Sequence, residues 1–224
     1  MRSIIALSLL LTLAACQSAY YGAAEKFGVH KRDILVDRVE ASRDAQGEAQ
    51  ESFQSALDQL TALTDYDGGD LEKIYKETDA NYKRAESAAE TVRERVAAVE
   101  NVADALFEEW EAEIEHYSSA SLKASSQRKL YETRERYART LEAMQTATRK
   151  MDPVLTSLND NVLYLKHNLN ARAVSAIRVE FESIERDIRA LIEEMRRSIA
   201  SSEDFINNMQ GDRATTVSAQ DSAG

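Results

Sequence analysis

The residues best suited to metal chemistry in this sequence are Glu113 and His116, which lie three positions apart. On a helix this spacing puts both side chains on one face, and di-iron bundles use two such Glu-x-x-His motifs with two further glutamates. Neither His30 nor His167 has a glutamate three residues before it, so the motif occurs once. We therefore expect no metal site and interpret His116 as an exposed histidine near a helix end, where the helix dipole favours a cation.

Catalytic and cofactor-binding motifs are also missing from the sequence. There is no Gly-x-Ser-x-Gly motif to hold a nucleophilic serine. Gly68 and Gly69 are followed by acidic residues and not by the lysine of a phosphate-binding loop. The many carboxylates fit charged helical faces. We therefore expect a protein that is not an enzyme and has no cofactor.

The formal net charge of −11 limits the kinds of partner. A surface this acidic is repelled by nucleic acids and by anionic lipid head groups. No group of basic residues with interleaved aromatic residues is visible in the sequence. We therefore expect no binding to nucleic acids.

Cys16 is the single cysteine, and it follows Leu13-Ala14-Ala15 at the end of a short apolar run. Residues 1–15 have the positive start, apolar stretch and small final residues of a secretory signal. This arrangement resembles the lipobox of bacterial lipoproteins, which implies cleavage before Cys16 and attachment of lipid to it. The alternatives are a short buried helix or an uncleaved anchor, because the apolar run spans only about half of a bilayer core.

The lipobox resemblance also implies a location. An aspartate after the cysteine often retains such proteins in the inner membrane, so Gln17 favours an outer membrane lipoprotein, which we expect to face the periplasm. The membrane would be reached through the lipid on Cys16, with residues 16–30 as a lipidated N-terminus and helical lead-in. Lipidation would leave no thiol for a disulfide, so stability must come from packing.

Glycine and proline usage predicts an all-α fold. From Asp70 to Gln210 there is one proline, Pro153, and no glycine. Sheets and tight hairpins usually need glycine at positive φ, whereas this stretch is rich in good helix formers. Pro153 follows a capping residue and lies in an unbroken apolar pattern, so it is compatible with a kinked helix.

Apolar or small residues recur at alternating spacings of four and three in four segments, as in a coiled-coil seam. Flanking apolar positions widen this stripe, which favours an elongated helical bundle. The first segment runs from Leu35 to Leu63 and the second from Thr78 to Trp110. The third runs from Leu130 to Leu169 and the fourth from Ile177 to Met209.

Breaks between these segments predict the topology. Residues 65–70 form a glycine-containing turn, and Ser118 to Ser121 form a weaker one. The apolar phase fails between Leu169 and Ile177, which predicts a third turn near Asn168 and Asn170, although one long helix with a stutter is the alternative. We expect four antiparallel helices, up-down-up-down, over residues 31–210. Residues 211–224 are polar and aperiodic, which predicts a disordered tail.

Two polar stretches interrupt the regular pattern. One includes Lys31, Arg32 and Asp33, and the other includes His167, Asn168, Asn170 and Arg172. Two interpretations are open for these residues. They cap helix ends and form ion pairs that fix how the helices align, or they form an interaction site. Together with the lipobox and the helical remainder, they resemble an uncharacterised bacterial lipoprotein family catalogued as domain of unknown function 2959. The resemblance implies a helical envelope lipoprotein and brings no catalytic residues.

Two functions remain open at this point. The first is a lipid-anchored, non-enzymatic scaffold or interaction protein of the bacterial cell envelope, with an envelope protein as partner. The alternative is a small-ligand or metal-binding bundle that uses polar groups near Asn168, Asn170 and Arg172. A dry interior would favour the scaffold, whereas a cavity with converging charges would favour the ligand site. The partner and the oligomeric state do not follow from the sequence.

Overall fold

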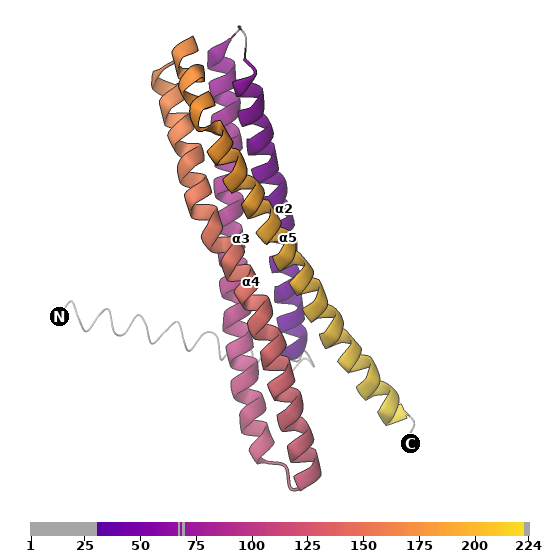
Figure 1. Ribbon diagram of the computed structural model, residues 1–224. Helices are drawn as coiled ribbons and strands as arrows, with labels where there is room; N and C mark the ends of the chain where they lie inside the picture. The colour runs from indigo at the N-terminus through magenta and orange to yellow at the C-terminus, as the bar shows by residue number, and fades with distance from the viewer. Residues whose placement is uncertain (1–30, 67, 69, 222–224) are drawn as a thin grey trace, which may run out of the picture.

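The computed structural model describes residues 31–66, 68 and 70–221. Over these residues the chain forms four long helices and no strand: α2 (Lys31–Thr64), α3 (Leu71–Glu115), α4 (Ala120–His167) and α5 (Ala171–Asp221). Short connections make successive helices antiparallel, and α5 also packs against α2 (Figure 1). The all-α, up-down-up-down fold is confirmed. The expected signal peptide (1–15) and lipidated lead-in (16–30), including Cys16, lie outside the described residues.

The helices begin where polar side chains can satisfy their first backbone N–H groups. Asp70 before α3 and Asn170 before α5 each accept hydrogen bonds from the N–H groups two and three residues later, at 3.0 and 3.2 Å. Ser119 caps α4 through its hydroxyl. Between α2 and α3, Gly68 has φ +146°, a conformation that side chains disfavour. The turns expected from these residue types are therefore present.

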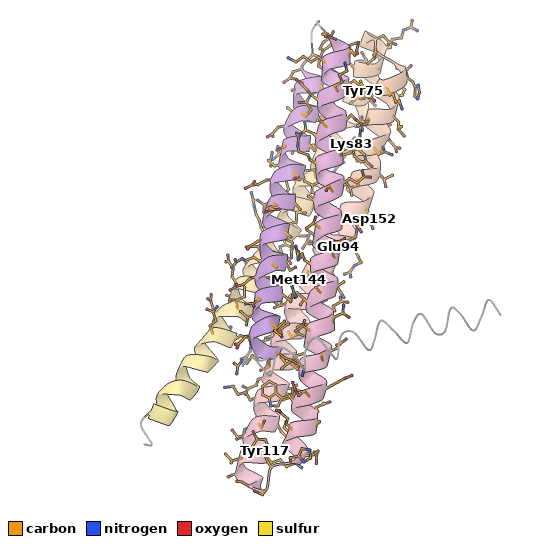
Figure 2. All side chains as sticks on the ribbon, turned by 180° about the vertical axis from the view of Figure 1, so that it is seen from behind. Tyr75, Lys83, Glu94, Tyr117, Met144 and Asp152 are labelled. Carbon is orange, nitrogen blue, oxygen red and sulfur yellow. The ribbon has the colours of Figure 1, made fainter. Side chains whose placement is uncertain are left out.

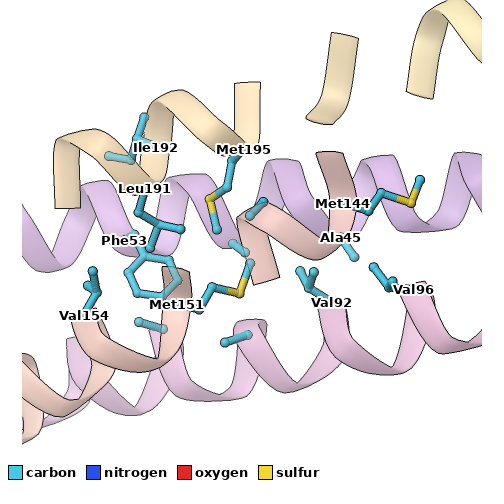
Figure 3. Close-up of a cluster of buried hydrophobic side chains, with 14 of the residues drawn as sticks. Ala45, Phe53, Val92, Val96, Met144, Met151, Val154, Leu191, Ile192 and Met195 are labelled. Atoms are coloured by element: carbon cyan, nitrogen blue, oxygen red, sulfur yellow. The ribbon is translucent and has the colours of Figure 1, made fainter. Parts of the chain in front are cut away.

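The predicted seam forms the core. Every seam residue of the first segment is buried in α2, from Leu35 to Leu63. Figure 3 shows Phe53 of α2 among Met151 of α4 and Leu191 and Met195 of α5. Some seam positions are less buried than the pattern predicts. Leu169 is 44% exposed because α4 ends at His167 and leaves it in the turn. Others are only partly buried, among them Tyr82, Trp110, Tyr137, Leu141 and Phe181.

The interior of the described bundle contains no buried charged side chain. Its buried polar side chains are all neutral, and most of them hydrogen-bond to the backbone of their own helix, four residues earlier, as Thr78, Asn81, Thr133, Asn161 and Ser202 do. Such groups need no partner on another helix, so they disturb the apolar packing little.

The bundle is closed at one end and open at the other (Figure 1). The α2–α3 and α4–α5 turns meet at the closed end, whereas the hairpin of α3 and α4 continues past the start of α2 at the other. Phe205 of α5 packs against Tyr137 of α4, with ring centroids 6.5 Å apart. Tyr137 lies about 27 Å along α4 from Ser119, so α5 runs back toward the end that holds the Ser118–Ser121 turn, as a chain reversal near Asn168 and Asn170 requires.

The C-terminal segment is helical to Asp221, whereas the sequence predicts a disordered tail from residue 211. No proline follows Gly211, and the helix continues through this glycine. Figure 1 shows this part of α5 leaving the bundle. Met209 is the last residue of α5 that is described as buried, close to the expected domain limit at residue 210.

Candidate interaction surfaces at the two ends

Exposed large apolar side chains are confined to two stretches of the part of the chain whose side chains are described. Their members are Tyr117, Leu122 and Tyr131 in the first stretch, and Leu163, Tyr164, Leu169 and Val179 in the second. We name these stretches the hairpin surface (residues 116–131) and the closed-end surface (residues 161–179). Single exposed apolar residues are ordinary, but groups of them mark sites of interaction.

Both surfaces also lack acidic residues, although the chain as a whole is strongly acidic. The hairpin surface contains Lys123, Arg128 and Lys129 with no aspartate or glutamate. The closed-end surface contains three basic residues and His167, again with no acid. The sides of the rod carry mixed charges that pair along each helix, such as Glu185 with Arg189 at 2.7 Å. The two surfaces therefore differ from the sides in exposing large apolar side chains and in having no acidic residue of their own. Acidic residues do lie beside them at the same ends, Glu113 and Glu115 of α3 beside the hairpin surface and Asp65 and Asp70 beside the closed-end surface.

The hairpin surface stands on two helices alone among the described residues. Trp110 of α3 donates its indole N–H to the hydroxyl of Ser126 of α4 at 2.9 Å. Nearer the turn, Lys123 pairs with Glu115 at 2.8 Å. These contacts across the hairpin hold α3 and α4 together beyond Lys31, the first described residue of α2, and beyond the point where α5 leaves the bundle. Figure 2 labels Tyr117 at the tip.

Arg134 links the same two helices where the hairpin leaves the bundle. Its guanidinium pairs with Glu111 of α3 and lies 5.1 Å from the centre of the Phe107 ring. The hydrogen bond from Arg134 lowers the pKa of Glu111. A groove of about 590 Å³ runs between α3 and α4 on this hairpin, and Ile114, Leu130, Tyr131 and Arg134 are among its lining residues.

The closed-end surface stands on a four-helix platform. Arg178 of α5 donates hydrogen bonds to the backbone carbonyl oxygens of Thr64 and Tyr66, the latter at 2.9 Å. These bonds tie α5 to the turn between α2 and α3. A cavity of about 270 Å³ between α4 and α5 is lined by residues that include Asp160, Tyr164 and Ile177.

The polar residues singled out from the sequence lie at opposite ends. Lys31 pairs with Glu109 of α3 at 2.9 Å, and Arg32 donates to the carbonyl oxygen of Met209 at 3.1 Å. Asp33 lines a cleft between α2 and α5 that also includes Met209. Lys31 and Arg32 therefore join helices at the root of the hairpin, and Asp33 lies beside them in the cleft.

At the closed end, Asn168 and Asn170 have backbone roles. The side-chain amide of Asn168 donates to the carbonyl oxygen of Tyr164 at 3.0 Å, while Asn170 caps α5. His167 and Arg172 are exposed, and neither lines the nearby cavity, nor do the two asparagines. The polar groups near Asn168, Asn170 and Arg172 therefore do not converge on a ligand pocket in this region.

The Glu-x-x-His motif is part of the α3 terminus. The backbone N–H of His116 caps α3 by donating to the carbonyl oxygen of Glu113 at 3.0 Å. No group of three histidine, cysteine or acidic side chains with metal-binding geometry occurs in the described part of the chain. Likewise, none of the helices in that part is long and apolar enough to cross a bilayer.

The exposed apolar residues of both ends were missed in the sequence analysis. Tyr117, Leu122, Tyr131 and Val179 fall outside the 3–4 seam, and this, together with the neighbouring acid-free sequence, is the signal that could have identified them. Apolar residues that do not fit the 3–4 spacing do not face the core of a helical bundle, so they are the ones expected on the surface.

Comparison with known families gives one match. The model of the family described as "Protein of unknown function (DUF2959)" matches residues 20–209, which is most of the chain. The chain belongs to this family. Its matched region ends at Met209, the last residue of α5 described as buried. No curated protein and no solved structure matches significantly.

Proposed function

We propose that this family member is a lipid-anchored, non-enzymatic helical scaffold of the bacterial cell envelope. The lipobox-like sequence before Cys16 supports the anchor, and Gln17 favours the outer membrane with the rod in the periplasm. At about 1.5 Å per residue, α4 alone is about 72 Å long. A rod of this length holds its closed end far from its N-terminal attachment.

The confinement of exposed large apolar side chains to the two ends, among the residues whose side chains are described, carries this proposal. A soluble rod without partners gains nothing from exposing Leu163, Tyr164 and Leu169 together at its closed end. The same end carries Lys166 and Arg172, which suit a partner with acidic groups around an apolar contact. The closed-end surface is therefore the docking site for an envelope protein, and the hairpin end lies toward the membrane.

Photo-crosslinking in intact cells tests the docking. A photoreactive amino acid at position 169 should give a discrete cross-linked band, whereas the same amino acid at position 94, exposed on the side of α3, should not. Equal yields at both positions would contradict a specific surface at the closed end. Adding Leu163→Ser to the position-169 protein should reduce the band without unfolding the rod.

The anchor has its own test. Cys16→Ser should abolish metabolic labelling with palmitate and release the protein from the membrane fraction. Persistent labelling in that variant would show that lipid is attached elsewhere, and the anchoring half of the proposal would fail while the docking half stands. The two experiments therefore separate where the protein is held from what it binds.

A small-ligand function is the alternative, and one cleft favours it. Between α4 and α5 a space of about 370 Å³ is lined by residues that include Arg136, Arg139, Thr140 and Asp204. Cationic and hydroxyl groups of this kind suit a small anionic or zwitterionic ligand. Calorimetric titration with inorganic phosphate and with amino acids, compared between the unsubstituted protein and Arg139→Gln, would reveal such binding.

A further inference from the structure

The groove on the hairpin has an apolar floor and partly charged walls. Ile114 and Leu130 form the floor and are almost fully buried, whereas Tyr131 on the wall is 67% exposed. Glu111 and Arg134 pair along one edge. Such a groove fits a segment that brings apolar side chains at helical spacing and little net charge.

The chain enters the bundle at the level where this groove begins. Lys31, the first described residue, is paired with Glu109, about half a turn of α3 before Glu111, the first groove residue on that helix. The residues that precede Lys31 therefore start at the root of the hairpin. From Glu109 to Tyr117 the hairpin extends about 12 Å, whereas residues 20–30 would span about 16 Å as a helix.

The sequence before Lys31 repeats the apolar pattern of α2. Ile34 and Leu35 are buried at the start of α2, and one heptad earlier the chain has Phe27. A second heptad back reaches Tyr20, with Ala23 between them at the helical spacing. The net charge of residues 20–30 is zero with histidine neutral, which suits a groove edged by a paired glutamate and arginine.

The limits of the family domain agree with this pattern. At its C-terminal limit the match stops at Met209, where the described burial of α5 also stops. At its N-terminal limit the match starts at Tyr20, before the first described helix. At the C-terminal limit, the family match and the buried part of α5 end at the same residue. By the same reasoning, residues 20–30, which the match includes, are expected to pack against the bundle.

We propose that Tyr20–His30 of the same chain occupies the hairpin groove, with Phe27 and Tyr20 against its apolar floor. This packing does not depend on the proposed function, because it concerns contacts within one chain. If the proposed lipid anchor is also correct, the groove brings Cys16 to the level of the α3–α4 turn. The rod then stands on its hairpin at the bilayer surface, and its closed end is held at a fixed distance.

Disulfide trapping tests the occupant. The experiment uses the chain from residue 16 onward with Cys16→Ser and two introduced cysteines. Phe27→Cys with Gln127→Cys, which lines the groove, should form an intramolecular disulfide at least about tenfold faster than Phe27→Cys with Arg128→Cys, because a disulfide needs Cβ atoms about 4 Å apart. Arg128 is exposed and does not line the groove, so it is the matched control.

Every other outcome overturns the proposal. Equal rates for the two cysteine pairs would mean that residues 20–30 contact the hairpin without binding specifically in the groove. If neither pair formed a disulfide, residues 20–30 would not lie in the groove. A disulfide-linked dimer from the Gln127 pair would assign the groove to a second copy of the chain. None of these results bears on whether Cys16 carries lipid, which the palmitate labelling decides.

Trp110 supplies a second measurement because it is the single tryptophan and lies beside the groove. Phe27→Ser should increase acrylamide quenching of Trp110 by about two-fold, since loss of packing opens the hairpin to solvent. Phe181→Ser makes the same chemical change on α5, remote from Trp110, and should leave quenching unchanged in the folded protein. Equal quenching in the Phe27→Ser, Phe181→Ser and unsubstituted proteins would contradict the packing of Phe27 in the hairpin groove.

Discussion

The two ends of the rod carry similar side chains on different supports. At the closed end, four helices meet and Arg178 ties α5 to the backbone at Thr64 and Tyr66. At the hairpin end, α3 and α4 project alone among the described residues, joined by Trp110 and Ser126. A surface on a four-helix platform keeps its shape when a partner docks, whereas a two-helix hairpin can adjust to whatever packs beside it.

The largest expected effect comes from the core that both ends share. Leu191→Ala removes a fully buried side chain and should lower the free energy of unfolding by about 2–5 kcal/mol. Leu122→Ala, on the 57% exposed hairpin side chain, should cost less than about 0.5 kcal/mol. Chemical denaturation monitored by circular dichroism measures both changes. Similar losses would mean that the hairpin surface is part of the cooperative core.

A smaller effect should distinguish the closed end from the hairpin end. Arg178→Ala removes two hydrogen bonds to the backbone and should cost about 1 kcal/mol. Amide exchange should accelerate in the α2–α3 turn and not at Ser119. Arg172→Ala, an exposed arginine six residues away, should change neither quantity. Unchanged exchange in Arg178→Ala would remove the structural distinction between the two ends.

A comparable but opposite effect is expected where α2 and α5 pack toward the hairpin end. The hydroxyl of Ser198 is buried and has no hydrogen-bond partner among the described residues. Ser198→Ala should therefore stabilise the protein by about 1 kcal/mol, because an unpartnered buried polar group is removed. Ser202→Ala is the control, since its hydroxyl bonds to the carbonyl oxygen of Ser198 and its loss should not stabilise.

The smallest effect concerns pH and the contact of α4 with α5. The Lys150 ammonium lies 2.7 Å from a Glu194 carboxylate oxygen and lowers the pKa of that carboxyl. A depressed carboxyl pKa stabilises the fold above the unfolded value near 4.5, and this contribution is lost as pH falls through the folded value. Glu194→Gln should flatten the loss of stability on acidification, by under about 1 kcal/mol.

Thermal melts from pH 6 to pH 3 measure this dependence. Lys150→Gln should flatten the curve only in part, because Arg197 still pairs with Glu194 at 3.3 Å and also lowers the pKa of that carboxyl. Steeper acid sensitivity in Glu194→Gln than in the unsubstituted protein would contradict the direction of the pKa shift.

Much of the fold could be predicted from the sequence because one pattern governs it. The 3–4 spacing of Leu35, Val39 and Phe53 fixes which face of α2 is buried, and capping residues such as Asp70 fix where helices start. The phase failure after Leu169 located the third turn, now confirmed by α4 ending at His167. These features depend on neighbours in sequence, which periodicity measures directly.

The unequal ends could not be predicted in the same way. The length of hairpin that projects beyond the bundle depends on where α5 stops packing, just past the contact of Phe205 with Tyr137. Contacts of this kind join residues far apart in the chain. The helical continuation past Gly211 was missed because polar composition predicts the lack of a core and not the lack of a helix. The exposed residues Leu122 and Val179 were missed because they lie outside the seam.

One helix, α4, connects the two surfaces without a turn. Leu122 lies near its start and Tyr164 near its end, and the helix is continuous through Pro153. If the proposed anchor and docking site both hold, α4 joins them as one continuous helix. Proline has no backbone N–H, so the bond that residue 153 would donate to the carbonyl oxygen of Arg149 is missing, and α4 has one backbone hydrogen bond fewer at that point.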